Sequence, residues 1–155
     1  MKPDEVMFSE TVRAEQTRRG SRAGYTHAAA KGRFKSDMSD EVIEFIAARN
    51  SAYLGTAGAD GQPYVQHRGG PPGFLRVVDR RTIAFADYAG NRQYISTGNL
   101  AENDKAFLFL MDYAGAQRLK LWGRARVLAD DSGFVFTVLA WDWNCSQHIP
   151  RLVPA

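Results

Sequence analysis

Polar side chains that could bind a phosphorylated ligand gather between Gln62 and Leu100, where the chain is expected to change direction. The candidates are Gln66, His67, Arg68, Asp87, Tyr88, Asn91 and Arg92. Arg92 stands out because it follows an asparagine that can cap a helix. A guanidinium at a helix N-terminus can clamp a phosphate with two hydrogen bonds, while the backbone N–H groups contribute their dipoles. The segment is therefore typical of a site for a phosphate-bearing ligand.

Further candidates flank this segment. Gly69 and Gly70 lack side chains, which lets a planar ring approach the backbone or simply permits a turn. Lys120 and Trp122 are two residues apart on a long alternating segment, so they share one face of a strand. The tryptophan could cover a ring or pack within the fold. His67 could reach a ligand or be a structural residue, and both alternatives remain open.

No metal site is expected. Cys145 and His148 have C-x-x-H spacing, but two ligands without a second pair fall short of a zinc site. Signatures of Rossmann dehydrogenases, P-loop NTPases, α/β-hydrolases and zincins are also missing from the sequence. These enzyme classes are therefore disfavoured.

The elements that must position these residues are mostly strands. Hairpin signals such as Asp60–Gly61 separate short apolar or alternating segments, which predicts consecutive antiparallel hairpins. Strands are expected at residues 52–57, 63–68, 74–78, 82–86, 106–111, 118–128 and 134–140. Residues 106–111 are continuously apolar, so this strand is expected to be buried on both faces. The pattern indicates a mainly β fold, a small barrel of about six to seven strands.

Two or three short helices complete the expected fold. Ser39 is a good N-cap for a helix over residues 40–49, and a second helix is expected at residues 92–101 after the Asn91 cap. Residues 1–36 are polar and basic, with one short helix expected up to Gly20. They are interpreted as an arm on the main domain or on a partner subunit, or as a frayed tail. Residues 37–155 then form one domain, as the length of 155 residues suggests. The last residues, rich in tryptophan, could cover a pocket mouth or bury a dimer seam.

Bulk properties exclude several classes. Apolar residues make up 45% of the chain, which indicates a globular rather than a disordered protein. The net charge of +3 is spread along the chain, so no nucleic-acid partner is expected. One cysteine permits no intrachain disulfide, and the N-terminus lacks a signal peptide. No apolar segment is long enough to span a membrane, so a cytoplasmic location is expected.

Three segments carry a resemblance to a known family: QPYVQHRGGPPGFL, FADYAGNRQYISTGNLAEN and KLWGRARV. In this order they resemble the pyridoxamine 5′-phosphate oxidase-like, FMN-binding split-barrel family, and most closely its bacterial flavin-nucleotide-binding branch. The resemblance extends from Ser39 to Val127, and a further short segment, AWDWNCSQHI, is also similar. It implies a split β-barrel that binds FMN between the two subunits of a homodimer and acts on a small-molecule redox substrate.

The resemblance also implies roles for individual residues. In relatives the start of the helix carries a Ser-Arg-Lys-like sequence that holds the FMN phosphate, and here it is Asn91–Arg92–Gln93. The arginine is kept and the lysine is replaced by Gln93, which removes one charge. The strand with Gln66, His67, Arg68 and Gly69 would lie along the flavin, and Lys120 and Trp122 would line it from the other subunit.

The resemblance leaves three functions open. The first is a flavin-dependent oxidoreductase of unspecified substrate. The second is a non-catalytic flavin carrier or sensor, because no clear acid, base or nucleophile is evident. The third is a barrel for another planar cofactor, such as haem or a deazaflavin.

The substrate-binding C-terminal segment of true pyridoxamine-phosphate oxidases is not recognisable. Relatives also carry a helix where this chain has only the short stretch between Asp130 and Phe134.

Overall fold

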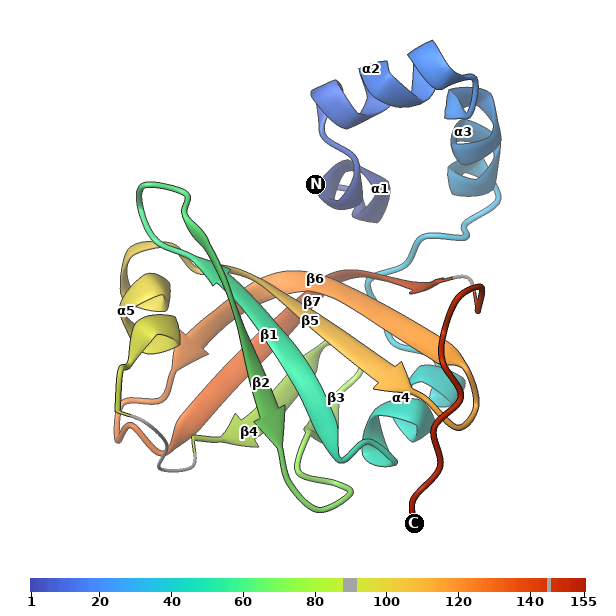
Figure 1. Ribbon diagram of the computed structural model, residues 1–155. Coiled ribbons are helices and arrows are strands. Elements are labelled where there is room, and N and C mark those ends of the chain that lie inside the picture. The colour runs from blue at the N-terminus through green and yellow to red at the C-terminus, as the bar shows by residue number, and fades with distance from the viewer. Residues whose placement is uncertain (88–91, 145) are drawn as a thin grey trace.

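The computed structural model describes residues 1–87, 92–144 and 146–155. In this described part there are seven strands and five helices (Figure 1). The strands are β1 (Ser51–Ala57), β2 (Pro63–Gly69), β3 (Arg76–Asp79), β4 (Thr82–Ala86), β5 (Lys105–Asp112), β6 (Gln117–Val127) and β7 (Gly133–Asn144). The helices are α1 (Pro3–Met7), α2 (Glu10–Arg19), α3 (Arg22–Ala30), α4 (Asp40–Ala47) and α5 (Ile95–Glu102).

All seven strands join one antiparallel sheet in the order β2-β1-β5-β6-β7-β4-β3. The sheet curls around a common core, so β2 at one end of the order approaches β4 near the other (Figure 1). Closure there depends on side chains, because β2 pairs with β1 and β4 pairs with β3 and β7. The expected fold class is confirmed: the protein is a mainly β split barrel with seven antiparallel strands.

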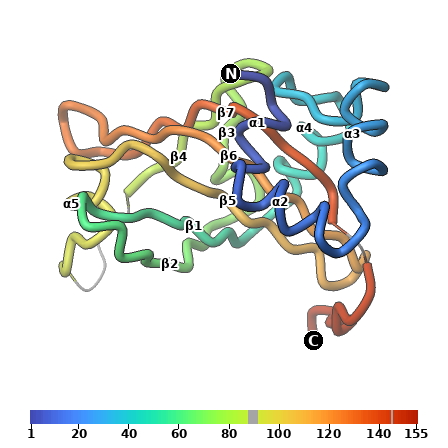
Figure 2. The backbone as a smooth tube through the Cα atoms, turned by 90° about the horizontal axis from the view of Figure 1, so that it is seen from above, coloured from blue at the N-terminus to red at the C-terminus, as the bar shows by residue number. Residues whose placement is uncertain are grey.

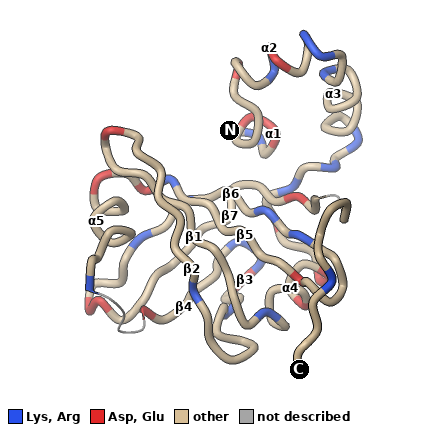
Figure 3. Tube along the Cα trace, in the orientation of Figure 1, with Lys and Arg blue, Asp and Glu red and all other residues tan. Residues whose placement is uncertain are grey.

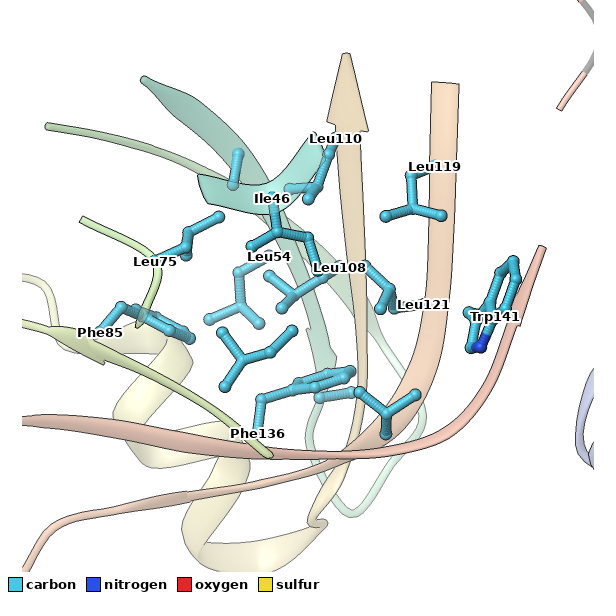
Figure 4. Close-up of a cluster of buried hydrophobic side chains, with 14 of the residues drawn as sticks. Ile46, Leu54, Leu75, Phe85, Leu108, Leu110, Leu119, Leu121, Phe136 and Trp141 are labelled. Atoms are coloured by element: carbon cyan, nitrogen blue, oxygen red, sulfur yellow. The ribbon is translucent and has the colours of Figure 1, made fainter. Parts of the chain in front are cut away.

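The core is formed by the inward-facing leucines and phenylalanines of the strands. Leu54, Leu108 and Leu121 interdigitate there with Phe136, and all are almost completely inaccessible to solvent (Figure 4). Helix α4 closes one end of the barrel with Ile46 and its neighbours on the same face. The predicted N-cap forms, since the Ser39 hydroxyl accepts a hydrogen bond of 3.3 Å from the Val42 N–H.

Strand β5 differs from the prediction that it is buried on both faces. Leu108 and Leu110 are buried, whereas Phe107, Phe109 and Met111 alternate with them and are only half-buried. Within one copy of the chain, one face of this apolar strand is therefore only partly covered. We call the sheet surface around it the outer face. Its members are Tyr53, Val65, His67, Phe107, Phe109, Met111, Arg118, Lys120 and Trp122.

A β-bulge between β6 and β7 sets which residues of β7 reach this outer face. The register shifts between Trp122 and Gly123, which moves Asp142 opposite Lys120 on the outer side. Trp141 points toward the barrel interior (Figure 4). A side chain at Gly123 would overlap the Thr137 carbonyl, so the close approach of the two strands requires glycine there.

The first 36 residues, which we call the arm, fold into three helices rather than the single short one expected. Ser9 caps α2 by accepting a hydrogen bond from the Val12 N–H, and Gly20 ends α2 in a left-handed conformation with φ 87°. The arm lies outside the barrel, next to the end of β7 (Figures 1 and 2). Helix α2, at 10 residues, is as long as any helix described and cannot cross a bilayer.

The tryptophan-rich segment was expected as a tail, but it forms the end of β7. Trp141 also anchors the arm, because its Nε1–H donates a hydrogen bond of 2.9 Å to the Asp37 carbonyl. A backbone bridge pairs Lys35 with Trp141 at the same place. The end of β7 therefore joins the barrel to the arm.

We predict that Trp141→Phe destabilises the protein by about 1 kcal/mol, the net value of one neutral hydrogen bond plus some lost packing. Urea denaturation followed by circular dichroism measures the difference. Trp143→Phe is the matched control, because no hydrogen bond from its indole is described. Equal losses in the two variants would remove the Trp141 anchor as the cause.

Candidate functional site

The candidate residues of β2 fall into two groups because successive side chains of a strand point to opposite faces. Gln66 and Arg68 point into the opening between β2 and β4. His67 points the other way and packs edge-on against Tyr53, with ring centres 5.5 Å apart. The structure therefore does not bring the three consecutive residues together in one site.

Arg68 fills the opening of the split barrel. Its Nη1 forms an ion pair of 3.1 Å with Oδ1 of Asp87, just after β4. Its guanidinium lies 4.4 Å from the ring centre of Phe134 on β7. The side chain is 12% exposed, and its Nε is buried without a hydrogen-bond partner among the described residues. This site thus holds a fixed cation, and the Nε–H of that cation has no described hydrogen-bond acceptor.

Gln66 connects this cation to helix α5. Its Oε1 accepts hydrogen bonds from the Ser96 hydroxyl at 2.8 Å and from Nη2 of Arg68 at 3.4 Å. Ser96 is buried in the first turn of α5. Sequence reasoning missed Ser96, although a serine in the first turn of a helix beside a predicted phosphate site was a usable signal. We call Gln66, Arg68, Asp87 and Ser96 the inner group.

Helix α5 begins later than predicted. It starts at Ile95 instead of Arg92, with Tyr94 as N-cap, and no described side chain caps it. Arg92 and Tyr94 both have left-handed backbones, with φ of 62° and 55°. Such conformations are costly for residues other than glycine, and they tend to occur at functional sites. Tyr88 and Asn91, two predicted site residues, lie outside the described residues.

The start of α5 has the features of an anion site. The first N–H groups of a helix have no partner within the helix, and here no described side chain replaces one. Arg92 and Gln93 are exposed and lie just before Tyr94, the N-cap of α5. Arg92 was predicted at the first position of the helix, and the structure instead places it three residues before the helix, outside the first turn.

Lys120 and Trp122 share the outer face, as their spacing predicted. The Lys120 ammonium lies 5.3 Å from the centre of the Trp122 indole, and Trp122 packs edge-on against Phe107 at 5.1 Å. Partial burial lowers the pKa of Lys120, and the nearby carboxylate of Asp142 opposes that shift. Asp142 is buried opposite Lys120 and pairs with Arg33 of the arm at 3.3 Å. Sequence reasoning noted Asp142 in the terminal segment but gave it no role.

A cavity of about 530 Å³ opens on the outer face. Its walls come from β1, β2, β5 and β6, and they are mostly aromatic and aliphatic. The lining residues are Tyr53, Gly55, Val65, Phe107, Phe109, Met111, Tyr113 and Arg118. A hydrogen bond with Tyr53 raises the pKa of Tyr113, with burial adding to the shift. The cavity can accept an apolar surface or the edge of a planar ring, with polar groups at its rim.

The remaining candidate residues belong neither to the inner group nor to the outer face. Gly69 ends β2 opposite Ser51. A Cβ on Gly70 would lie 2.7 Å from Cβ of Phe74, so Phe74 already occupies the space that a ring would need there. Cys145 is outside the described residues. Within the described ranges, His, Cys, Asp and Glu side chains do not gather in groups of three that could hold a metal ion.

Comparisons with known proteins agree with this fold. The family model described as pyridoxamine 5′-phosphate oxidase matches residues 38–143. HupZ from Group A Streptococcus is 15% identical over 75% of this chain and 99% of its own, with a TM-score of 0.56. No curated protein matches the sequence.

Two further solved structures are similar. One is a putative pyridoxamine 5′-phosphate oxidase from Lactobacillus delbrueckii, 17% identical over 70% of this chain and 95% of its own, with a TM-score of 0.53. The other is a Clostridium acetobutylicum protein related to general stress protein 26, of the pyridoxinephosphate oxidase family. It is 16% identical over 72% of this chain and 89% of its own, with a TM-score of 0.52. At these identities the structures show the fold, and the family model spans about two thirds of the chain. The chain therefore belongs to the pyridoxamine 5′-phosphate oxidase family.

Proposed function

We propose that this protein is an FMN-binding homodimer that acts as a flavin-dependent oxidoreductase. One observation carries the proposal: the start of α5, which no described side chain caps, follows Arg92 and lies beside the inner group that contains the Arg68 cation. Two guanidinium groups and free backbone N–H groups are the donors that a phosphate monoester requires. Membership of the family supports FMN as the phosphate-bearing ligand.

The residues present suit the cofactor. Arg92 and the first N–H groups of α5 would hold the phosphate, and the unpaired Nε of Arg68 leaves one buried donor near them. The left-handed backbone at Arg92 and Tyr94 is the kind of strain that a bound ligand can compensate. When bound, FMN supplies two-electron redox chemistry, and the protein supplies binding and electrostatics.

The outer face would supply the remainder of the flavin site. His67, Lys120 and Trp122 lie there, away from the inner group. In the dimer, these side chains of one copy would face the flavin held by the α5 start of the other copy. A half-buried ammonium such as Lys120 can stabilise negative charge on a reduced ring, because its charge is only partly screened by solvent.

The homodimer is supported by the uncovered face of β5. A strand that is apolar on both faces is normally covered on both. Here Phe107, Phe109 and Met111 are only half-buried by the described part of their own chain, and they line a cavity with Tyr53. A second copy packed on this face would bury them through a self-complementary interface.

Arg92→Ala tests the phosphate site. We expect FMN to bind about 1.5–3 kcal/mol more weakly, roughly 10- to 150-fold, because a charge-assisted hydrogen bond is lost. Quenching of flavin fluorescence during titration measures the dissociation constant. Arg76→Ala, at an exposed arginine on β3, is the matched control and should leave binding unchanged. Equal affinity of the Arg92 variant and the wild type would remove Arg92 from the site.

Catalysis and ligand identity are tested on the purified protein. Mass spectrometry of the ligand released on denaturation distinguishes FMN from haem or a deazaflavin. Bleaching of the bound flavin by NADH or NADPH, followed by reoxidation, would support an oxidoreductase. A flavin that stays bound and is not reduced by either donor would favour the carrier or sensor.

A further inference from the structure

Asp142 is a largely buried carboxylate between the arm and the outer face. The β-bulge of β6 and β7 places it opposite Lys120, and its side chain is 12% exposed. Its Oδ2 accepts a hydrogen bond of 3.3 Å from Nη2 of Arg33, at the base of the arm. A buried carboxylate requires a compensating charge. In this structure the arm supplies that charge.

The junction of the arm with β7 holds Arg33 in this position. The N–H of Arg33 donates a hydrogen bond of 3.1 Å to the Ala28 carbonyl at the end of α3, and its guanidinium lies 5.2 Å from the ring centre of Phe34. Two residues later, the Lys35 carbonyl accepts a hydrogen bond of 3.1 Å from the Trp141 N–H. Residues of both signs of charge therefore lie together where the chain passes from the arm to the barrel (Figure 3).

Lys120 is a second cation beside Asp142, but the two side chains form no ion pair in the described part of the chain. The Lys120 ammonium lies instead 5.3 Å from the centre of the Trp122 indole. Asp142 is paired with Arg33, whose charge already compensates the carboxylate. The ammonium of Lys120 is therefore left on the outer face, where the proposed function places the flavin.

The charged groups that act on Lys120 come from β6, β7 and the arm. Burial lowers the pKa of Lys120, the Asp142 carboxylate opposes that shift, and the guanidinium groups of Arg33 and Arg118 add to it. Phe109, opposite Lys120 on β5, carries no charge. The acidic residues of α1, which packs on β7, are paired within the arm: Asp4 with Arg13, and Glu5 with the Lys2 N–H. Arg33 thus acts on Lys120 in two ways, as a like charge and by neutralising Asp142.

We propose that Arg33 is a positioning residue for Lys120: by pairing with Asp142, it leaves the Lys120 ammonium on the outer face over Trp122. The inference rests on the proposed function, which places Lys120 beside the flavin. Without Arg33, the carboxylate would take Lys120 as its partner, because an unpaired buried charge is costly. The ammonium would then turn from the indole toward β7. The arm therefore controls the positive charge that the outer face offers to the flavin.

The pH dependence of Lys120 acetylation tests this pairing in the full-length protein with no flavin added. Only the neutral amine reacts with acetic anhydride, so the rate rises with pH through the pKa of the lysine. We expect Arg33→Gln to raise the midpoint, since Asp142 then stabilises the ammonium, and Asp142→Asn to lower it. At pH 8, acetylation of Lys120 should become about threefold slower in the first variant and about threefold faster in the second.

Mass spectrometry of the acetylated peptides measures the rates, with the exposed Lys105 as internal reference, and circular dichroism verifies folding. Arg18→Gln is the matched control, because it removes the same charge from α2 of the same arm and should leave Lys120 unchanged. Opposite shifts are the signature of charge, since a loosened junction would speed acetylation in both variants. The inference is wrong if either Arg33→Gln or Asp142→Asn leaves the midpoint unchanged, or if both move it in the same direction.

Binding of oxidised and reduced FMN tests the link to the flavin site. Arg33→Gln should lower the preference for reduced, negatively charged FMN about threefold, because the ammonium no longer faces the ring. On a Lys120→Gln background the same substitution should have little further effect, since Arg33 acts through Lys120. An equal effect on both backgrounds would overturn the inference. A wild type that binds no FMN would refute the proposed function, whereas the acetylation result would still decide the pairing of Lys120.

Discussion

Arg68→Met is expected to destabilise the protein by about 2–4 kcal/mol, because it removes one partner of a largely buried ion pair. Arg68 and Asp87 are 12% and 25% exposed, so little solvent screens the interaction. The pair spans the opening between β2 and β4, where no strand hydrogen bonds are described. The variant also loses the contact of the guanidinium with the Phe134 ring, while methionine keeps part of the apolar stem. Urea denaturation measures the loss.

A double-mutant cycle separates the pair from the packing. Asp87→Leu alone should also destabilise the protein, but the double variant should lose less than the sum of the two single changes. Arg76→Met, at an exposed site on β3, should stay within about 0.5 kcal/mol of the wild type. Full additivity of the two changes would show that the ion pair does not close the barrel.

The position of Arg68 shows how far sequence reasoning reaches at this site. Alternation along a strand already separates His67 from Gln66 and Arg68, so the two faces could have been distinguished from the sequence. The pairing of Arg68 with Asp87 could not have been predicted from the sequence, because Asp87 lies 19 residues away and meets Arg68 only when the sheet curls. Contacts across an open barrel depend on sheet curvature, which local pattern does not encode.

The fold itself was largely predictable from local pattern. Alternating or apolar segments, separated by turn signals such as Asp60–Gly61, predicted all seven strands, and the Ser39 cap predicted the start of α4. The start of α5 was placed three residues too early, because Asn91 looked like a cap while Tyr94 takes that position in a left-handed conformation. The arm was under-predicted because its helices depend on each other and on an aromatic cluster instead of an apolar face.

The wrong expectation for β5 is informative about function. The sequence pattern predicted two covered faces, and one copy of the chain covers one. Both statements hold if a second copy covers the other face. The residues involved are large and aromatic, the type that carries most binding energy when buried at the centre of an interface. The discrepancy therefore supports the proposed dimer.

Phe107→Asp is expected to convert the proposed dimer into monomers, raising its dissociation constant by about a thousandfold or more. The carboxylate would be buried without a partner at the centre of the outer face, which costs several kcal/mol, and the two-fold arrangement places it there twice. In the monomer the side chain is half-buried and contacts Trp122 edge-on, so folding should lose only about 1 kcal/mol. Light scattering coupled to size-exclusion chromatography measures the mass.

Val78→Asp is the matched control, since it introduces the same charge at a residue that is 54% exposed on β3, outside the outer face. It should leave the dimer intact. If FMN binds between two copies, the Phe107 variant should also lose FMN even though Arg92 and the inner group are unchanged. A folded Phe107 variant that remains dimeric would place the interface elsewhere. A monomer that still binds FMN at full affinity would show that one copy completes the site.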